Sequence, residues 1–184
     1  SRGLGDVYKR QLLFRKLLMH MDHMINQGKM INQLDLFFDV KIKNWSRLEG
    51  YGLYCKLANE TWSMYSKKKG SLSIRLTDNK EIRFFNKKWR NKDLATNVLA
   101  FPSLYPKINS RIIYIGDIVI AYEIVKKEAN FNNIPIVNHV SHLIVHGILH
   151  LIGFSHDNVT DEKKMKKIEK NILKTVGIID PYAS

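Results

Sequence analysis

The chain has 184 residues, of which 45% are hydrophobic and 26% charged, with 10 Gly and 4 Pro. This length and composition are those of one globular domain, and they exclude disordered, collagen-like and low-complexity chains. The net charge of +13 favours a polyanionic partner such as nucleic acid. A lysine-rich solvated surface explains the same charge equally well, so charge alone does not identify a partner.

The first 22 residues differ from the rest of the chain. The stretch from Leu4 to Gln11 resembles translated sequencing-adapter read-through, and the first residue is not Met. We therefore expect residues 1–22 to be a non-native or disordered extension and residues 23–184 to form the domain. The basic excess persists without the extension.

Neither a membrane span nor a disulfide is predicted. The strongest apolar runs, Ile112 to Tyr122 and Val137 to Phe154, fall short of the ~20 apolar residues that a span requires. The single Cys55 cannot form a disulfide within the chain. We therefore expect a cytoplasmic protein with no membrane partner.

The hydrophobic pattern predicts strands and helices mixed along the chain. The predicted strands are Leu34–Ile42, Ser71–Leu76, Val98–Phe101 and Ile112–Tyr122. The predicted helices are Trp45–Lys67, interrupted near Gly50 and Gly52, then Asn79–Trp89 capped by Asp78, Glu123–Asn130, Val137–Ile152 stopped by Gly153, and Thr160–Val176. This order predicts a single α/β or α+β domain.

Five of the seven histidines lie between residues 139 and 156, most of them on the helix predicted from Val137. Three of them, His142, His146 and His150, are spaced by four residues and share one helix face. Zinc holds imidazole nitrogens at ~2.0–2.1 Å, whereas His142 and His150 are ~12 Å apart along the axis. One helix therefore supplies two ligands, and we expect His142 to pack beside the site.

A third ligand follows the end of that helix. Gly153 can adopt the left-handed conformation and turn the chain back, so that His156 meets His146 and His150. Three neutral imidazoles leave one tetrahedral position open, which is typical of a catalytic zinc. We predict one metal ion held by His146, His150 and His156, with zinc favoured over other first-row divalent ions.

The same spacing is found in metzincin metalloproteases, whose motif is His-Glu-x-x-His-x-x-Gly-x-x-His. The glutamate that serves those proteases as general base is replaced here by Gly147. We therefore rank peptide hydrolysis below other metal-assisted hydrolysis.

Two blocks resemble the YbeY family of bacterial zinc-dependent endoribonucleases, the ribosomal RNA maturation factors. His146-Gly-Ile-Leu-His-Leu-Ile-Gly-Phe-Ser-His156 resembles the family hallmark His-Gly-x-Leu-His-Leu-x-Gly-aromatic-Asp-His. Asn86-Lys-Lys-Trp-Arg-Asn-Lys-Asp-Leu-Ala-Thr-Asn-Val-Leu-Ala-Phe-Pro102 is similar to the family's Asn-x-x-aromatic-Arg-x-x-Asp-x-x-Thr-Asn-Val-Leu-Ser-Phe-Pro. Gly116 to Ile120 and the ending Gly177 to Tyr182 also match, in the same order.

The resemblance implies a small mixed sheet flanked by helices and a zinc-dependent endoribonuclease of the single-strand type. The expected activity is maturation of small-subunit ribosomal RNA and ribosome quality control, with RNA and not DNA as partner. The family's metal ligands correspond to His146, His150 and His156, and its active-site arginine to Arg90. The residues themselves favour equally a surface salt bridge between Arg90 and Asp93, with no part in the reaction.

One position departs from the family pattern. The aspartate before the third histidine is Ser155 here, and an aspartate follows at position 157. This departure favours a second hypothesis, a non-catalytic RNA-binding factor of ribosome assembly that contains a metal ion. We expect nearby lysines, Lys87, Lys88 and Lys92, to hold the RNA backbone.

Overall fold

The computed structural model describes residues 33–45, 50–103, 111–179 and 181–182, so the predicted extension over residues 1–22 lies outside the described part. The strands are β1 (Leu34–Val40), β2 (Lys69–Thr77), β3 (Val98–Pro102) and β4 (Ile112–Ala121). The helices are the short 3-10 helix η1 (Lys43–Trp45), α2 (Tyr51–Ser63), α3 (Asn79–Arg90), α4 (Tyr122–Phe131), α5 (Ile136–Leu151) and α6 (Val159–Lys174).

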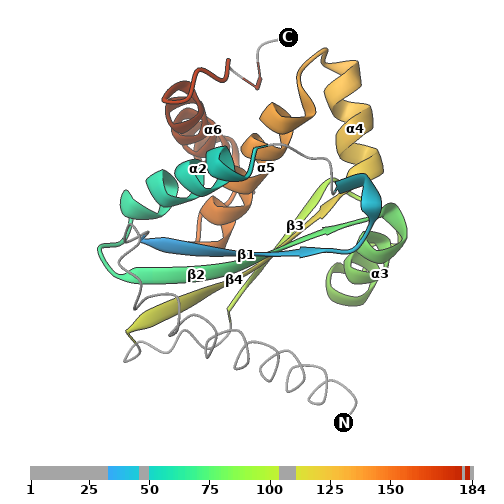
Figure 1. The fold of residues 1–184 in the computed structure, drawn as a ribbon, viewed down its shortest axis with the longest axis horizontal. Coiled ribbons are helices and arrows are strands. Elements are labelled where there is room, and N and C mark those ends of the chain that lie inside the picture. The colour runs from blue at the N-terminus through green and yellow to red at the C-terminus, as the bar shows by residue number, and fades with distance from the viewer. Residues whose placement is uncertain (1–32, 46–49, 104–110, 180, 183–184) are drawn as a thin grey trace. The chain divides into compact units, whose positions relative to one another are not determined.

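The four strands form one mixed sheet in the order β1-β2-β4-β3 (Figure 1). Strands β1, β2 and β4 run parallel, and β3 pairs antiparallel with β4 at the edge. The α/β class and the small mixed sheet flanked by helices are therefore confirmed. The strand ends agree with the hydrophobic alternation to within two residues.

The helix predicted from Trp45 to Lys67 is shorter than expected. Trp45 ends the separate 3-10 helix, and α2 begins only after Gly50, whose φ of 122° is one that residues with side chains rarely adopt. Gly52, by contrast, lies inside α2 and does not interrupt it. The predicted break is therefore at Gly50 alone.

Helices cover both faces of the sheet, and the strand alternation assigns each face (Figure 1). Ile118 and Ile120 of β4 pack in the large core with α2 and α5. Val119, between them, packs with Ile82 and Phe85 of α3. Helix α3 therefore covers the face of the sheet opposite to α5.

Helix α5 lies close to the sheet because one of its residues has no side chain. A Cβ atom on Gly147 would lie 2.7 Å from Cδ1 of Ile118, closer than real Cβ atoms approach other atoms. Six hydrophobic residues of α5 are at most 3% exposed: Leu143 at 3%, and Val140, Ile144, Val145, Ile148 and Leu149 at 0%. This packing fixes the rotation of α5 and so the direction of its histidines.

No single helix in the described part of the chain is long and apolar enough to cross a membrane. Helices α4 and α5 reach that length and composition only together, and they meet at a bend of 116°.

Candidate metal centre

The end of α5 is built so that the chain reverses direction immediately after His150. Gly153 has a φ of 98°, its N–H donates to the carbonyl of His150 at 3.1 Å, and the N–H of Phe154 donates to the carbonyl of Leu149 at 2.9 Å. These two bonds form a Schellman motif, which requires a left-handed residue such as glycine. The turn brings His156 back to the helix, as the position of Gly153 predicts.

The structure brings His146, His150 and His156 together. One ring nitrogen from each lies within 4.8 Å of the other two. The ring centroids are 4.5 Å apart for His146 and His150, and 4.9 Å apart for His150 and His156. The first two rings are partly buried, whereas His156 is exposed at the edge of the group.

Hydrogen bonds fix which nitrogens of the two helix histidines face each other. Nδ1 of His146 donates to Oε1 of Glu169 at 2.8 Å, and Nδ1 of His150 donates to the carbonyl of Phe154 at 3.0 Å. Their Nε2 atoms, 3.0 Å apart, are then left with lone pairs directed at each other. Burial and the neighbouring His146 lower the pKa of His150, which favours the neutral form of that ring.

This donor set fits a metal ion. Two lone pairs 3.0 Å apart repel each other unless a proton or a metal ion lies between them. Tetrahedral zinc with bonds of ~2.0–2.1 Å separates its nitrogen ligands by about 3.3 Å, close to the spacing of these nitrogens. A carboxylate and a carbonyl bonded to the outer ring nitrogens are the partners that ligating histidines usually have.

Glu169 of α6 is a site residue that the sequence analysis missed. Its side chain is completely buried, and it accepts hydrogen bonds from His146 and from the hydroxyl of Tyr182. Burial alone would raise the pKa of Glu169, but bonds with His142, His146 and Tyr182 outweigh it and bring the pKa to about 2. The buried carboxylate is therefore charged and anchors the histidines.

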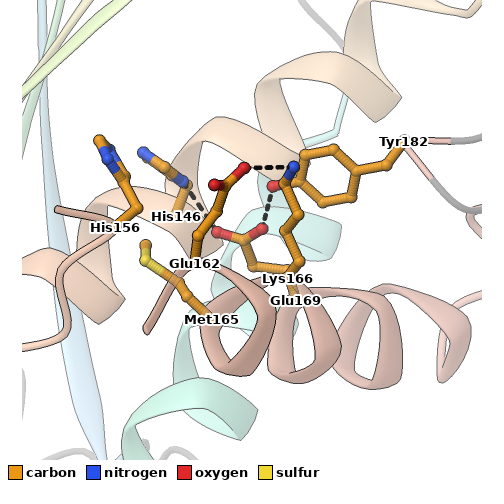
Figure 2. A pocket seen from close by; sticks show the side chains of 7 residues that line it. All are labelled: His146, His156, Glu162, Met165, Lys166, Glu169 and Tyr182. Carbon is orange, nitrogen blue, oxygen red and sulfur yellow. Dashed lines mark hydrogen bonds and ion pairs between the residues drawn. The ribbon is translucent and has the colours of Figure 1, made fainter. Parts of the chain in front are cut away.

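These residues line a pocket of about 330 Å³ between α5 and α6 (Figure 2). The lining consists of His146, His156, Glu162, Met165, Lys166, Glu169 and Tyr182. Lys166 forms an ion pair with Glu162 at 2.5 Å, and its Nζ lies 4.8 Å from the centre of the Tyr182 ring. The pocket thus combines histidine nitrogens with one exposed cation beside an aromatic ring.

The sequence family described as Endoribonuclease YbeY matches residues 48–177. The chain belongs to the YbeY family. It is similar to proteins named Endoribonuclease YbeY from Bradyrhizobium diazoefficiens, 46% identical over 116 residues, and from Rhodopseudomonas palustris strain CGA009, 43% identical over 114 residues. Each alignment covers 61% of this chain and, respectively, 63% and 60% of the relative, so the chain spans less than two thirds of these proteins. A Thermotoga maritima protein solved in solution matches 81% of this chain and 99% of its own, at 23% identity and a TM-score of 0.49.

Two further histidines of α5 have other partners in this YbeY family member. Nε2 of His142 lies 3.0 Å from the hydroxyl of Tyr182 and 3.5 Å from Glu169, on the side of His146 away from His150. This agrees with the expectation that His142 packs beside the site. His139 lies 2.7 Å from Glu128 of α4 and so joins α4 to α5.

A second group of possible ligands, His142, His146 and Glu169, also has its donor atoms within 4.8 Å of one another. In that group Oε1 of Glu169 already accepts the proton on Nδ1 of His146. The two groups share His146, and the three-histidine group alone leaves a lone pair on each of two adjacent nitrogens.

The structure does not bring Arg90 to the histidines. Arg90 is the exposed last residue of α3, which packs on the opposite face of the sheet from α5. Among the described residues Asp93 pairs with Arg83 at 2.8 Å and with Lys87 at 2.7 Å. These partners replace the salt bridge between Asp93 and Arg90 that was the alternative explanation of Arg90. These ion pairs lower the pKa of Asp93 and compensate part of the positive charge of α3.

Ser155 and Asp157 flank the third histidine of this YbeY member differently. Ser155 is partly buried before His156, and Asp157 is exposed after it.

Gly147, where metzincin proteases have their catalytic glutamate, faces Ile118 in the sheet. A glutamate at that position would collide with the core, which argues against a peptidase built on this helix.

Proposed function

We propose that this chain is a zinc-dependent endoribonuclease of the cytoplasm that acts on precursors of small-subunit ribosomal RNA and in ribosome quality control. One zinc ion would be held by His146, His150 and His156. The observation that supports this most directly is the pair of Nε2 lone pairs, 3.0 Å apart, whose rings are fixed through their outer nitrogens. Membership of the YbeY family supports the reaction and the substrate.

Each of the chain's own residues has a defined part in this proposal. A zinc ion held by the three histidines would supply Lewis-acid catalysis. Glu169 keeps the proton of His146 on Nδ1, and the Phe154 carbonyl does the same for His150. The orientation of both rings is thereby set before RNA binds, so that orienting the ligands would cost little at the moment of reaction.

Basic residues would bind the RNA. Lys166 lines the pocket and is positioned for a phosphate next to the cleaved bond. The family resemblance assigns Arg90 to the negative charge of the cleaved phosphate, but Arg90 ends α3 on the opposite face of the sheet from the histidines, so we propose that its guanidinium binds a phosphate farther along the RNA. Lys88 and Lys92 are exposed beside it, where they would contact the RNA backbone.

The test is metal content together with RNA cleavage, measured on the full chain and two histidine variants. The native chain should carry about one zinc ion. Loss of partners of ligating histidines already costs about 10–100-fold, so His146→Ala should lower cleavage by at least about 100-fold and lose the metal. His139→Gln, on the same helix but outside the group, should keep both. A chain without metal, or a His146→Ala variant with native cleavage, would refute the proposal.

A non-catalytic ribosome-assembly factor is the second candidate, and Ser155 is the observation that favours it. If the chain binds RNA and metal but shows no metal-dependent cleavage, the outcome depends on Ser155→Asp. Cleavage gained by that variant would show a nuclease weakened by the serine. No gain would favour the assembly factor.

A further inference from the structure

Helix α3 exposes two aromatic side chains to solvent. Phe84 is 58% exposed and Trp89 is 47% exposed, whereas Ile82 and Phe85 of the same helix are buried against the sheet. Helix α3 therefore packs against the sheet without using these two rings. Exposed aromatic rings that gather on one element, beside polar residues, are typical of a binding surface.

The exposed side of α3 is also strongly basic. Between residues 79 and 92 the basic residues are Lys80, Arg83, Lys87, Lys88, Arg90 and Lys92, and Glu81 is the acidic one. Nζ of Lys88 lies 5.8 Å from the centre of the Phe84 ring and 5.0 Å from that of Trp89. A cation is thus placed between two aromatic faces.

Aromatic faces interleaved with cations bind single-stranded nucleic acid. Unpaired bases stack on the rings, and lysines and arginines hold the phosphates, while a duplex hides its bases. Phe84 and Trp89 are about 140° apart around the helix, but Nζ of Lys88 lies 5.8 Å and 5.0 Å from their ring centres, so the two rings are no more than about 11 Å apart and one strand can contact both. An anionic membrane surface would also attract this charge, but the exposed apolar side chains of α3 are two rings with Lys88 close to both, not a continuous apolar stripe.

We propose that the exposed face of α3 is a stacking platform for a single-stranded segment of RNA, with Phe84 and Trp89 stacking bases and the neighbouring basic residues holding phosphates. The platform lies on the opposite face of the sheet from α5 and its histidines. It therefore holds a part of the RNA that flanks the cleaved bond. The choice of RNA over DNA rests on the proposed function, whereas the stacking mode rests on α3 alone.

The experiment follows the fluorescence of Trp89 in the full chain. The other two tryptophans, Trp45 and Trp62, are 2% and 5% exposed, so quenching by an added oligonucleotide reports mainly on Trp89. We expect a short 2′-O-methyl oligoadenylate to quench this signal and the blunt duplex of the same sequence to bind more weakly. Anisotropy of a labelled oligonucleotide gives the affinity of variants without tryptophan at position 89.

Alanine variants decide the outcome. Phe84→Ala and Trp89→Ala should each weaken oligonucleotide binding about tenfold, and Trp89→Phe should restore most of it. The control is Phe131→Ala, which removes a ring that is 89% exposed at the end of α4, next to asparagines. Unchanged affinity of both α3 variants would overturn the platform, as would equal binding of the duplex. Binding to vesicles of anionic lipid in preference to the oligonucleotide would overturn it in favour of a membrane surface.

This test is independent of the nuclease reaction, because no bond is cleaved in it. A chain that never cleaves RNA would refute the proposed function and leave the platform to be judged by the variants. A chain that cleaves RNA but binds it without Phe84 and Trp89 would refute the platform alone.

Discussion

The histidine pocket and the exposed face of α3 are both charged, but they are built in opposite ways. In the pocket the two helix histidines are fixed through their outer ring nitrogens, His146 by Glu169, whose side chain is 0% exposed, and His150 by the Phe154 carbonyl. On α3 the functional groups lie in water, and their attachments are surface ion pairs such as Lys87 with Asp93. Buried partners fix geometry, whereas exposed cations give affinity that depends on salt. The pocket suits chemistry and the helix face suits holding a flexible strand.

The largest expected effect tests whether Glu169 positions the metal ligands. Glu169→Gln replaces the charged acceptor of the His146 proton and weakens its bond with Tyr182, so we expect metal affinity to fall about 10–100-fold. Competition with a chelator measures this. Glu162→Gln is the matched control, because Glu162 also lines the pocket but pairs with Lys166 at the surface. Equal affinity of native chain and Glu169→Gln would mean that the buried partner does not control the site.

The second test concerns the contact that holds α5 against the sheet. Gly147→Ala would place a methyl group 2.7 Å from Cδ1 of Ile118, and we expect it to lower the free energy of unfolding by about 1–3 kcal/mol. The control is Gly52→Ala in α2, where a Cβ has nothing within 4 Å and the change should stabilise the helix by about 0.5 kcal/mol. Urea unfolding distinguishes the two signs. Stabilisation by both variants would show that α5 can move away from the sheet.

The sequence predicted the elements and the meeting of the three histidines because both depend on local patterns. Strand alternation locates β1 to β4, and the left-handed Gly153 explains why His156 returns to His150. Glu169 and Tyr182 reach the site across 23 and 40 residues of sequence from His146 and His142, through packing that no local pattern encodes. The sequence does contain one signal that indicates Glu169. Glu169 lies between Met165 and Ile172 on the buried stripe of α6, where a charged residue needs a partner.

The position of Arg90 was not predictable in the same way. The block from Asn86 to Pro102 suggests one functional unit with the histidines, yet its first part ends α3 on the opposite face of the sheet from α5, while Val98 and Ala100 of β3 pack with α5. Sequence order does not reveal which face a helix covers. That assignment depends on the connection from β2 through α3 to β3, which only the three-dimensional topology shows.

A third, smaller effect tests whether the two regions are independent. The carboxylate of Asp78 accepts the N–H of Glu81 at 2.8 Å and caps α3, so Asp78→Ala should cost about 1 kcal/mol of stability. Metal affinity should not change, because α3 does not contribute to the pocket. The comparison is Asn158→Ala, which removes the corresponding cap of α6, the helix that carries Glu169. If loss of the α3 cap weakened metal binding as much as loss of the α6 cap, the two regions would be coupled.

The smallest expected effect concerns the charge of α3. Asp93 holds Arg83 and Lys87 in ion pairs that compete with RNA phosphates, so Asp93→Asn should raise affinity for a single-stranded oligonucleotide about two- to threefold and steepen its dependence on salt. Asp39→Asn is matched in charge, since Asp39 likewise lies between a lysine and an arginine, but it is located at the end of β1. Both variants change the net charge of the protein by the same amount. If the charge acts locally on α3, the affinity for the oligonucleotide should depend more steeply on salt concentration in Asp93→Asn than in Asp39→Asn. Equal slopes for the two variants would instead mean that the RNA responds to the total charge of the protein, and the comparison between a built pocket and a specific helix face would then hold only for the pocket.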